Sequence, residues 1–241
     1  MRTIKSEIVF AIPAHGREDI LHQVILDLKA KSEKYLKLDY SILVCSDWES
    51  DCFDIAALEM TEFTHHDNSN LGRKFNHLMH EAANYGRYIV LLGSDDLLTK
   101  AYFQELNNIV RHDAVCAAGL KSALFCGVQS LEVYQVNHRD DSWVGSGMVV
   151  RDFIVDELRG EIFPEIDKGL DRSGQNKIKN LIKLQRKQYG NIDPVKNGII
   201  CLKEVDNIHN FAGFKKGHRL HFEDLDTEDQ KTIINIKNGH S

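Results

Sequence analysis

The chain has few of the features that divide, cross-link or anchor a protein. Its 241 residues include only three prolines, and no stretch rich in glycine, proline and serine separates one domain from another. The longest apolar run near the N-terminus covers residues 8–14; it is too short to cross a bilayer, and no small-residue cleavage pattern follows it. We therefore expect no transmembrane segment and no cleaved leader.

Neither the cysteines nor the net charge points to an unusual compartment or partner. The five cysteines form no CxxC pair, and their odd number does not suit a disulfide framework, so reduced thiols in a cytoplasmic protein are expected. The formal net charge is only −6 at pH 7. That value argues against a protein that coats nucleic acid or acidic membranes over its whole surface, although it leaves room for a local basic patch.

What the chain does have is a regular alternation of buried strands and amphipathic helices. Apolar runs typical of buried strands occupy residues 8–12, 40–45 and 88–92, with a weaker strand at 62–65. Helical periodicity occupies residues 20–34, 55–60, 74–85 and 102–110. This order predicts an α/β fold with a mostly parallel, Rossmann-like central sheet covered by helices.

The pattern changes in the second half of the chain. Short extended segments at residues 114–118, 131–136 and 147–150 alternate with turns, which predicts an antiparallel C-terminal addition to the same sheet. A basic amphipathic helix at 175–189 and a strand at 198–202 follow. The length and the missing linker favour a single domain over residues 1–241.

Polar side chains follow three of the predicted strands. His15 and Arg17 come after the first strand, Asp47 after the second, and Asp95 with Asp96 after the strand at 88–92. Ligands of open α/β sheets bind at the carboxyl ends of parallel strands, so these groups predict a site at one edge. Adjacent carboxylates repel each other, and a divalent cation with a phosphate co-ligand would compensate them. Capping of the next helix is an alternative role for the acidic pair.

Four segments in this order carry a family resemblance: IVFAIPAHGRED, YSILVCSDWESD, NSNLGRKFNHLMHEA and RYIVLLGSDDLL. They resemble the nucleotide-sugar-binding half of glycosyltransferases with the GT-A fold, in particular the large inverting family 2 type that includes polysaccharide synthases. The resemblance covers residues 1–105 well and the remainder loosely. It implies a nucleotide-sugar-binding half at 1–112, an acceptor-binding half at 113–241, and hexosyltransferase-like activity.

The resemblance also implies a donor site for a nucleotide sugar, with UDP as the expected nucleotide and Mn²⁺ or Mg²⁺ as cofactor. The residues that would border the nucleotide, its ribose and its phosphates are Pro13, Ala14, His15, Arg17, Asp47, Asn70, Gly72, Lys74, Asn76 and Ser94. Asp95 would be the direct metal ligand of the family's Asp-x-Asp segment, with Asp96 beside it. The chain departs from the family at Gly93, where the first acid of that segment usually stands.

The second half supplies the expected catalytic base and a third metal ligand. An inverting transfer needs a carboxylate near the acceptor hydroxyl, and by resemblance this is Asp171, with Asp167 second and Glu165 third. Asp171 could instead only cap the helix at 175–189. His209, in the segment NIHN, resembles the C-terminal histidine that often binds the metal or the phosphates in GT-A enzymes.

Basic residues on the helix at 175–189 suggest one kind of acceptor. A stripe on one face consists of Lys179, Lys183, Arg186 and Lys187. A solvated helix face explains it, and so does binding of a polyanionic acceptor, such as DNA with hydroxymethylated bases, a cell-surface polymer or an anionic lipid headgroup. Two other functions stay open: a nucleotidyltransferase, and a nucleotide-sugar-binding module without catalysis.

Overall fold

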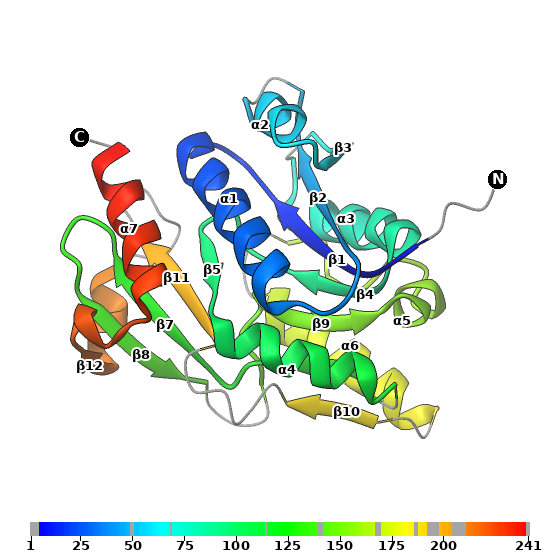
Figure 1. Cartoon of the computed structure of the whole chain (residues 1–241). Helices are drawn as coiled ribbons and strands as arrows, with labels where there is room; N and C mark the ends of the chain where they lie inside the picture. Colours follow the sequence, from blue (N-terminus) through cyan, green and yellow to red (C-terminus); the bar gives the residue numbers. More distant parts are fainter. Residues whose placement is uncertain are drawn as a thin grey trace.

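The structure is a computed structural model of the chain. It describes residues 5–48, 51–67, 69–113, 115–138, 142–166, 170–185, 188–191, 198–203 and 211–239. Its central sheet has seven strands in the order β10-β6-β9-β4-β1-β2-β3 (Figure 1). These strands are β1 (Ser6–Pro13), β2 (Tyr40–Ser46), β3 (Glu62–His65), β4 (Gly86–Leu91), β6 (Val115–Gly119), β9 (Met148–Arg151) and β10 (Gln188–Asn191).

The pairing of these strands confirms the predicted α/β fold class. β1 lies parallel to β2 and to β4, and β2 lies parallel to β3. β9 runs antiparallel between β4 and β6, which is the predicted antiparallel addition to the sheet. As a result, β1, β2 and β4 all end at the same edge, where the sequence places its polar residues.

Helices cover both faces of this sheet. They are α1 (Glu18–Tyr35), α2 (Cys52–Leu58), α3 (Leu71–Tyr85), α4 (Lys100–Arg111), α5 (Asp152–Glu157), α6 (Leu170–Leu184) and α7 (Thr227–Gly239). Alternate residues of β1 separate the two faces: Phe10 belongs to the core shared with α1 and α4, and Ala11 to the core shared with α3, α5 and α6 (Figure 1). A buried parallel strand needs apolar residues on both faces, and that is why residues 8–12 form a continuous apolar run.

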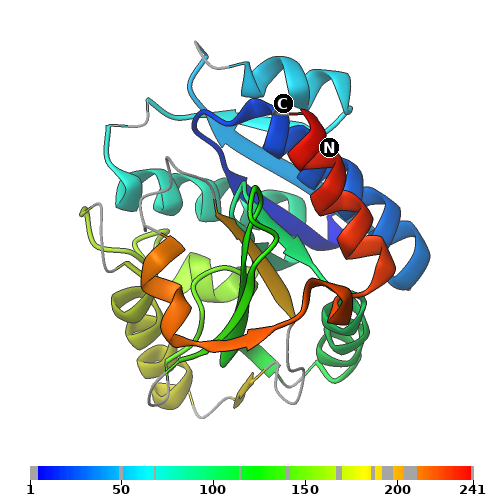
Figure 2. The same ribbon diagram turned by 90° about the vertical axis from the view of Figure 1, so that its left-hand side faces the viewer.

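A second sheet is the main departure from the prediction. It contains five strands in the order β12-β8-β7-β11-β5 and lies beside the first (Figure 2). Its strands are β5 (Asp96–Leu98), β7 (Ser122–Gly127), β8 (Val133–Asn137), β11 (Ile199–Lys203) and β12 (His218–Leu220), with short 3-10 helices η1 (Phe211–Lys216) and η2 (Phe222–Asp224) nearby. The sequence pattern did not indicate β5, β7 or β12, and it assigned the segment of β8 to the central sheet. The consequence is that β11 pairs antiparallel with β5, directly beside the acidic pair.

Helix α6 begins earlier and ends earlier than predicted. A stripe of Leu170, Gly174, Ile178 and Ile182 is buried at a spacing of four residues, so the helix starts at Leu170 instead of residue 175. Gly174 resembles a helix breaker in the sequence, but a Cβ there would lie 2.6 Å from the ring of Phe163, so the close packing requires glycine. Residues 188 and 189 belong to β10 and not to the helix.

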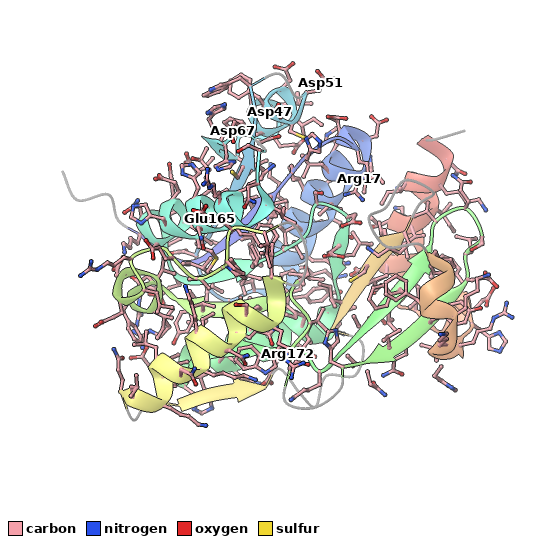
Figure 3. The ribbon with its side chains drawn as sticks, turned by 180° about the vertical axis from the view of Figure 1, so that it is seen from behind. Arg17, Asp47, Asp51, Asp67, Glu165 and Arg172 are labelled. Carbon is pink, nitrogen blue, oxygen red and sulfur yellow. The ribbon has the colours of Figure 1, made fainter. Side chains whose placement is uncertain are left out.

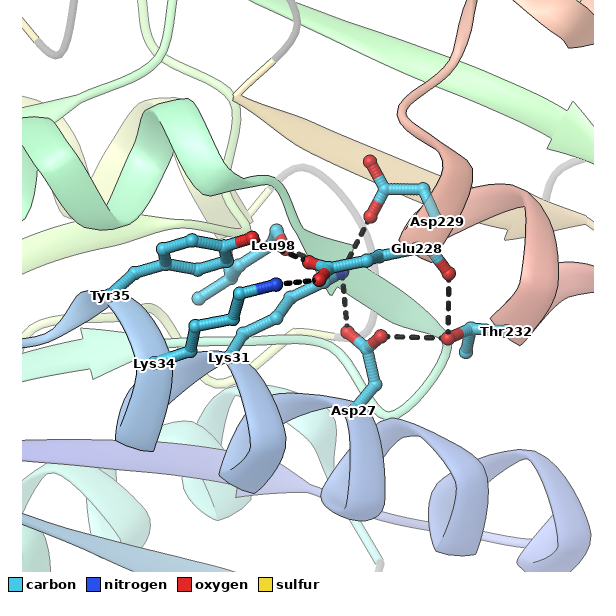
Figure 4. Close-up of polar contacts among 8 residues, drawn as sticks. All are labelled: Asp27, Lys31, Lys34, Tyr35, Leu98, Glu228, Asp229 and Thr232. Atoms are coloured by element: carbon cyan, nitrogen blue, oxygen red, sulfur yellow. Dashed lines mark hydrogen bonds and ion pairs between the residues drawn. The ribbon is translucent and has the colours of Figure 1, made fainter.

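A buried lysine attaches the C-terminal helix α7 to α1, and the two helices lie side by side (Figures 2 and 4). The Nζ of Lys31 lies 2.7 Å from Asp27 and 2.5 Å from Asp229, and it donates a hydrogen bond of 3.0 Å to the carbonyl of Leu98. Burial alone lowers the pKa of Lys31, but the two carboxylates outweigh burial and raise it above its usual value. Among the described residues, no helix is both long and apolar enough to cross a membrane.

Replacing Lys31 by alanine tests this attachment. The change would leave two carboxylates facing each other without their buried counter-charge, which costs about 3–5 kcal/mol. We expect the free energy of unfolding, measured by urea denaturation, to fall by that order. Lys34→Ala removes the exposed ion pair with Glu228 and is the matched control, with a much smaller expected change. Equal effects of the two substitutions would contradict the assignment.

Candidate functional site

The loop after β1 directs Arg17 toward the acidic pair. Gly16 and Arg17 both have positive φ values, 63° and 58°, and the second is unusual for a residue with a side chain. This backbone turns the guanidinium inward, and its Nη1 lies 2.8 Å from the Oδ2 of Asp95. A strained residue whose side chain makes an ion pair at a strand end fits a functional role.

A second cation reaches the same carboxylate oxygen from the other half of the chain. The Nζ of Lys203, at the end of β11, lies 3.3 Å from Asp95 Oδ2. The strands set this position, because the N–H of Leu202 donates to the carbonyl of Asp95 at 2.8 Å. The sequence analysis missed Lys203, which lies 108 positions from Asp95. One feature of the sequence did indicate Lys203: the apolar run at 198–202 is followed by a charged residue, as the other strands of the site are followed by polar ones.

The environment of the Arg17–Asp95–Lys203 cluster is partly dry. The side chains of Asp95 and Lys203 are only 15% and 12% exposed, and Arg17 is 30% exposed. Burial alone lowers the pKa of Lys203, but the charge of Asp95 outweighs burial and raises it, so the ammonium stays charged. Two positive groups therefore share one carboxylate at the edge of the sheet.

Asp96 is buried beside this cluster. Its side chain is buried, and its Oδ1 has no hydrogen-bond partner among the described residues. Burial, with the charge of Asp95, raises the pKa of Asp96, because an ionised carboxylate is disfavoured in a dry site. The predicted role of Asp96 as a metal ligand stays a prediction.

The position of Asp96 also explains the departure at Gly93. A Cβ at residue 93 would lie 2.3 Å from the Oδ2 of Asp96, so the Asp96 carboxylate occupies the space that a side chain at residue 93 would need. The N–H of Gly93 donates to the hydroxyl of Ser146 at 2.9 Å, which fixes the backbone there. An acidic side chain at residue 93, where the family's motif has its first acid, is therefore sterically incompatible with the observed position of Asp96. Ser94, between them, is buried.

The described side chains do not fit a dedicated site for a divalent cation. They contain no group of three His, Cys, Asp or Glu residues that could hold a metal ion. Asp95 is the one carboxylate of the acidic pair at the edge, and two cations already contact it. At an effective dielectric constant of 20, a divalent ion about 4 Å from a fixed ammonium would meet a repulsion of about 8 kcal/mol. His209 lies outside the described residues, so its metal role stays a prediction.

The predicted nucleotide-binding residues of the β1 and β2 ends form a rigid loop. Pro13 ends β1, and the carbonyl of Ala14 accepts hydrogen bonds from the buried ammonium of Lys74 and from the hydroxyl of Ser46. Burial lowers the pKa of Lys74. Lys74 therefore stabilises the loop from the protein interior, whereas the prediction placed it against the nucleotide.

His15 and Asp47 lie at the outer side of this loop. Figure 3 shows Asp47 beyond the end of β2, with Arg17 beyond the end of β1. The Nδ1 of His15 lies 3.9 Å from the Oδ2 of Asp47, and the histidine side chain is 75% exposed. These two side chains can meet an incoming ligand, so their predicted role beside the base or ribose stays open.

The start of α3 packs tightly against the segment at 162–166. Asn70 caps the helix, because its side-chain oxygen accepts from the N–H of Arg73 at 3.0 Å. A Cβ on Gly72 would lie 1.9 Å from the carbonyl oxygen of Pro164. Both residues thus have local structural roles that explain their presence without a ligand.

Asn76 holds the same segment from within α3. Its side chain donates to the carbonyl of Phe163 at 2.9 Å and accepts from the N–H groups of Ile162 and Phe163, at 2.9 and 2.8 Å. These bonds occupy the amide, so Asn76 is a support and not a lining residue as predicted. On the exposed side of α3, Arg73 forms an ion pair of 2.6 Å with Glu165, which Figure 3 shows beside the helix.

The expected base lies near the start of α6, but only its backbone is described. Asp171 is the second residue of α6, so it sits inside the first turn and does not precede the helix as predicted. Asp167 lies outside the described residues. Both assignments stay predictions, and Figure 3 shows the neighbouring Arg172 on the same helix.

The basic stripe on α6 is less available than the sequence suggests. The ammonium of Lys179 lies 4.3 Å from the centre of the ring of buried Trp143, a cation–π contact. Lys183 is exposed, whereas Arg186 and Lys187 lie outside the described residues. The contacts described give no support to a DNA acceptor, and a polyanionic acceptor stays a prediction.

Substitution of Gly93 by alanine tests the geometry at the acidic pair. The added methyl group would collide with Asp96, and overpacking of this kind costs about 1–3 kcal/mol. We expect a matching loss of unfolding free energy in urea. Gly213→Ala, where an added Cβ meets nothing within 4 Å, is the control. Combining Gly93→Ala with Asp96→Ala should recover part of the loss; no recovery would show that the carboxylate is not what fills the space.

Comparisons with known proteins identify the fold. No family model and no curated protein matches the sequence. Residues 1–349 of S. aureus TarS in complex with UDP-GlcNAc superpose with a TM-score of 0.62 at 13% identity, covering 96% of this chain and 65% of that one. PcManGT, a mannosyltransferase from Pyrobaculum calidifontis in complex with GDP-Man and Mn²⁺, gives 0.56 at 12% identity, covering 99% and 74%.

A third similar structure is glucosyl-3-phosphoglycerate synthase from Mycobacterium tuberculosis, in complex with phosphoglyceric acid. It gives a TM-score of 0.52 at 12% identity, covering 78% of this chain and 70% of that one. The chain spans less than two thirds of the TarS structures, at 60% of the fragment and 37% of the longer chain. At these identities the likeness establishes the architecture alone: the chain has the fold of GT-A-type glycosyltransferases.

Proposed function

We propose that this chain is a glycosyltransferase that moves a hexose from a nucleotide sugar to a hydroxyl group of an acceptor. The observation that carries the proposal is the Arg17–Asp95–Lys203 cluster, which lies at the edge where parallel strands end and α/β sheets bind nucleotides. The fold supports it, since TarS and PcManGT with this architecture hold UDP-GlcNAc and GDP-Man.

The donor would lie across the ends of β1 and β2. Its base and ribose would meet His15 and Asp47, and its diphosphate would face Arg17 and Lys203. As the bond between the sugar and the diphosphate breaks, negative charge builds up on the leaving group, and fixed positive groups stabilise that charge. UDP is the nucleotide expected from the sequence, and GDP is the alternative that PcManGT suggests. Cytoplasmic action, expected from the cysteine usage, belongs to the same proposal.

The metal expected from the sequence, Mn²⁺ or Mg²⁺, has a single carboxylate to bind among the described residues of the cluster. Asp95 would hold it after Arg17 and Lys203 had moved away. The proposed transfer does not depend on that ion, because the two side chains already place positive charge where the leaving group would form.

Donor binding and turnover are the direct test. At a hundredfold excess over its dissociation constant, a bound nucleotide stabilises the folded protein by about 2.7 kcal/mol. We expect UDP or GDP to raise the melting temperature and a UDP- or GDP-sugar to be hydrolysed slowly to the nucleoside diphosphate. Release of pyrophosphate would instead indicate a nucleotidyltransferase, and tight binding without turnover would indicate a binding module.

The base assignment has its own test. In an inverting transfer, the carboxylate of Asp171 would take the proton of the acceptor hydroxyl as that oxygen attacks the anomeric carbon. We expect Asp171→Asn to lower turnover by about 10²- to 10⁴-fold, because general-base catalysis contributes that much. Donor affinity should stay unchanged, and Arg172→Gln is the neighbouring control. If Asp171→Asn left turnover intact, the base would have to be sought in Asp167 or Glu165.

A further inference from the structure

We propose that Lys31 is a positioning residue for the donor site. Its ammonium holds β5 against α1, and the C-terminal helix α7 keeps that ammonium in place through Asp229. The inference rests on the proposed function, because the group that Lys31 positions is Asp95, the acidic residue of the proposed site. It predicts that a change in the contact between α1 and α7 alters the binding of a nucleoside diphosphate.

The first support is the way in which β5 is held. β5 is the last strand of its sheet, and among the described strands it pairs only with β11. The N–H of Thr99 donates to the carbonyl of Gly198 at 3.1 Å, on the side of β11. Successive residues of an antiparallel strand turn their backbone groups alternately toward the partner strand and away from it, so the carbonyl of Leu98 faces away from β11. The ammonium of Lys31 donates to that carbonyl at 3.0 Å and thereby holds the edge of β5 that no described strand covers.

The second support is the set of acceptors around this ammonium (Figure 4). An ammonium has three N–H donors, and those of Lys31 meet three oxygens, each from a different element. The three acceptors are the carboxylates of Asp27 in α1 and Asp229 in α7 and the carbonyl of Leu98 in β5. The hydroxyl of Thr232 in α7 also donates to Asp27 at 2.8 Å. The direction in which Lys31 meets β5 therefore depends on α7.

The third support is that α1 and β5 are joined at both ends of β5. Arg17, at the start of α1, contacts Asp95, which directly precedes β5. Lys31, further along the same helix, contacts Leu98, the last residue of β5. The groups of a functional site have to be held to within about 0.5 Å. A shift of β5 against α1 therefore disturbs the pair of Arg17 and Asp95, although Lys31 is not part of that pair.

Hydrogen exchange tests the effect on β5 without any ligand. The full chain is compared with Lys31→Met, and the exchange of single amides is followed by NMR. We expect the amides of Thr99 and Leu202, which donate across β5 and β11, to exchange roughly tenfold faster in the variant. The amide of Leu92, which donates to the carbonyl of Ala11 in the central sheet, is the internal reference, and its rate should change much less.

Nucleotide binding tests the effect on the site. It is measured by calorimetry on the same samples, at a temperature where circular dichroism shows every variant folded. We expect Lys31→Met to weaken binding of UDP or GDP by about 3- to 30-fold, the usual size for a residue that acts on a site without touching its ligand. Asp229→Asn, which keeps the lysine and removes one charge from α7, should give a smaller change in the same direction.

Two control variants separate positioning from general stability. Lys34→Ala breaks an exposed ion pair between α1 and α7, and Ile154→Ala destabilises the core at α5. Neither variant should change the nucleotide affinity or the ratio of the Thr99 and Leu92 exchange rates.

Two results would overturn the inference and leave the proposed function intact: equal acceleration of exchange at Thr99 and Leu92, or a nucleotide affinity of Lys31→Met equal to that of the wild type. If Lys31→Met does not fold, Asp229→Asn is used for both measurements, and the same two results decide. If the wild type binds neither UDP nor GDP, the proposed function fails, and the inference about its site fails with it.

Discussion

The carboxylate of Asp95 joins the parts of the molecule that are distant in sequence. Through it, the loop after β1 is connected to the end of β11, and the seven-stranded sheet is connected to the five-stranded one. Arg17 adopts a left-handed backbone to reach this carboxylate, and that conformation costs about 1–2 kcal/mol. The ion pair offsets this cost, so the geometry of the site depends on one acidic side chain held between two cations.

Two glycines set how closely the surrounding segments approach. At Gly72, α3 meets the carbonyl of Pro164, and at Gly93 the backbone lies against the carboxylate of Asp96. In both places a methyl group has no room, although neither residue has a positive φ. Residues that look like ligand-binding glycines in a motif are explained here by packing, which leaves the charged side chains as the groups that can meet a substrate.

The sequence predicts what is encoded locally and misses what depends on distant pairing. The runs at 8–12, 40–45 and 88–92 are long and apolar, so their strands were predicted correctly, and Arg17 and Asp95, which follow two of them, meet at one edge. β5 is three residues long and begins at the second acid, Asp96, so it has no strand signature, and without it the neighbour of Asp95 could not be inferred. The pairing of β11 with β5 is what places Lys203 beside Asp95. The start of α6 was not predicted because a glycine such as Gly174 is typical of a helix break. Its close packing against Phe163, which requires glycine, is visible only in the structure.

Lys31 and Lys203 are both paired with carboxylates, but they lie at different places in the fold. Lys31 has two carboxylates and a carbonyl around it, so negative charge is in excess and a further anion would be repelled. Lys203 contacts Asp95, which Arg17 also contacts, at the edge of the sheet where β1 and β4 end. Burial of a charge is costly in both places. At Lys31 the surrounding oxygens compensate that cost within the fold, and at Lys203 the carboxylate of Asp95 does so at the sheet edge, where the proposed donor site lies.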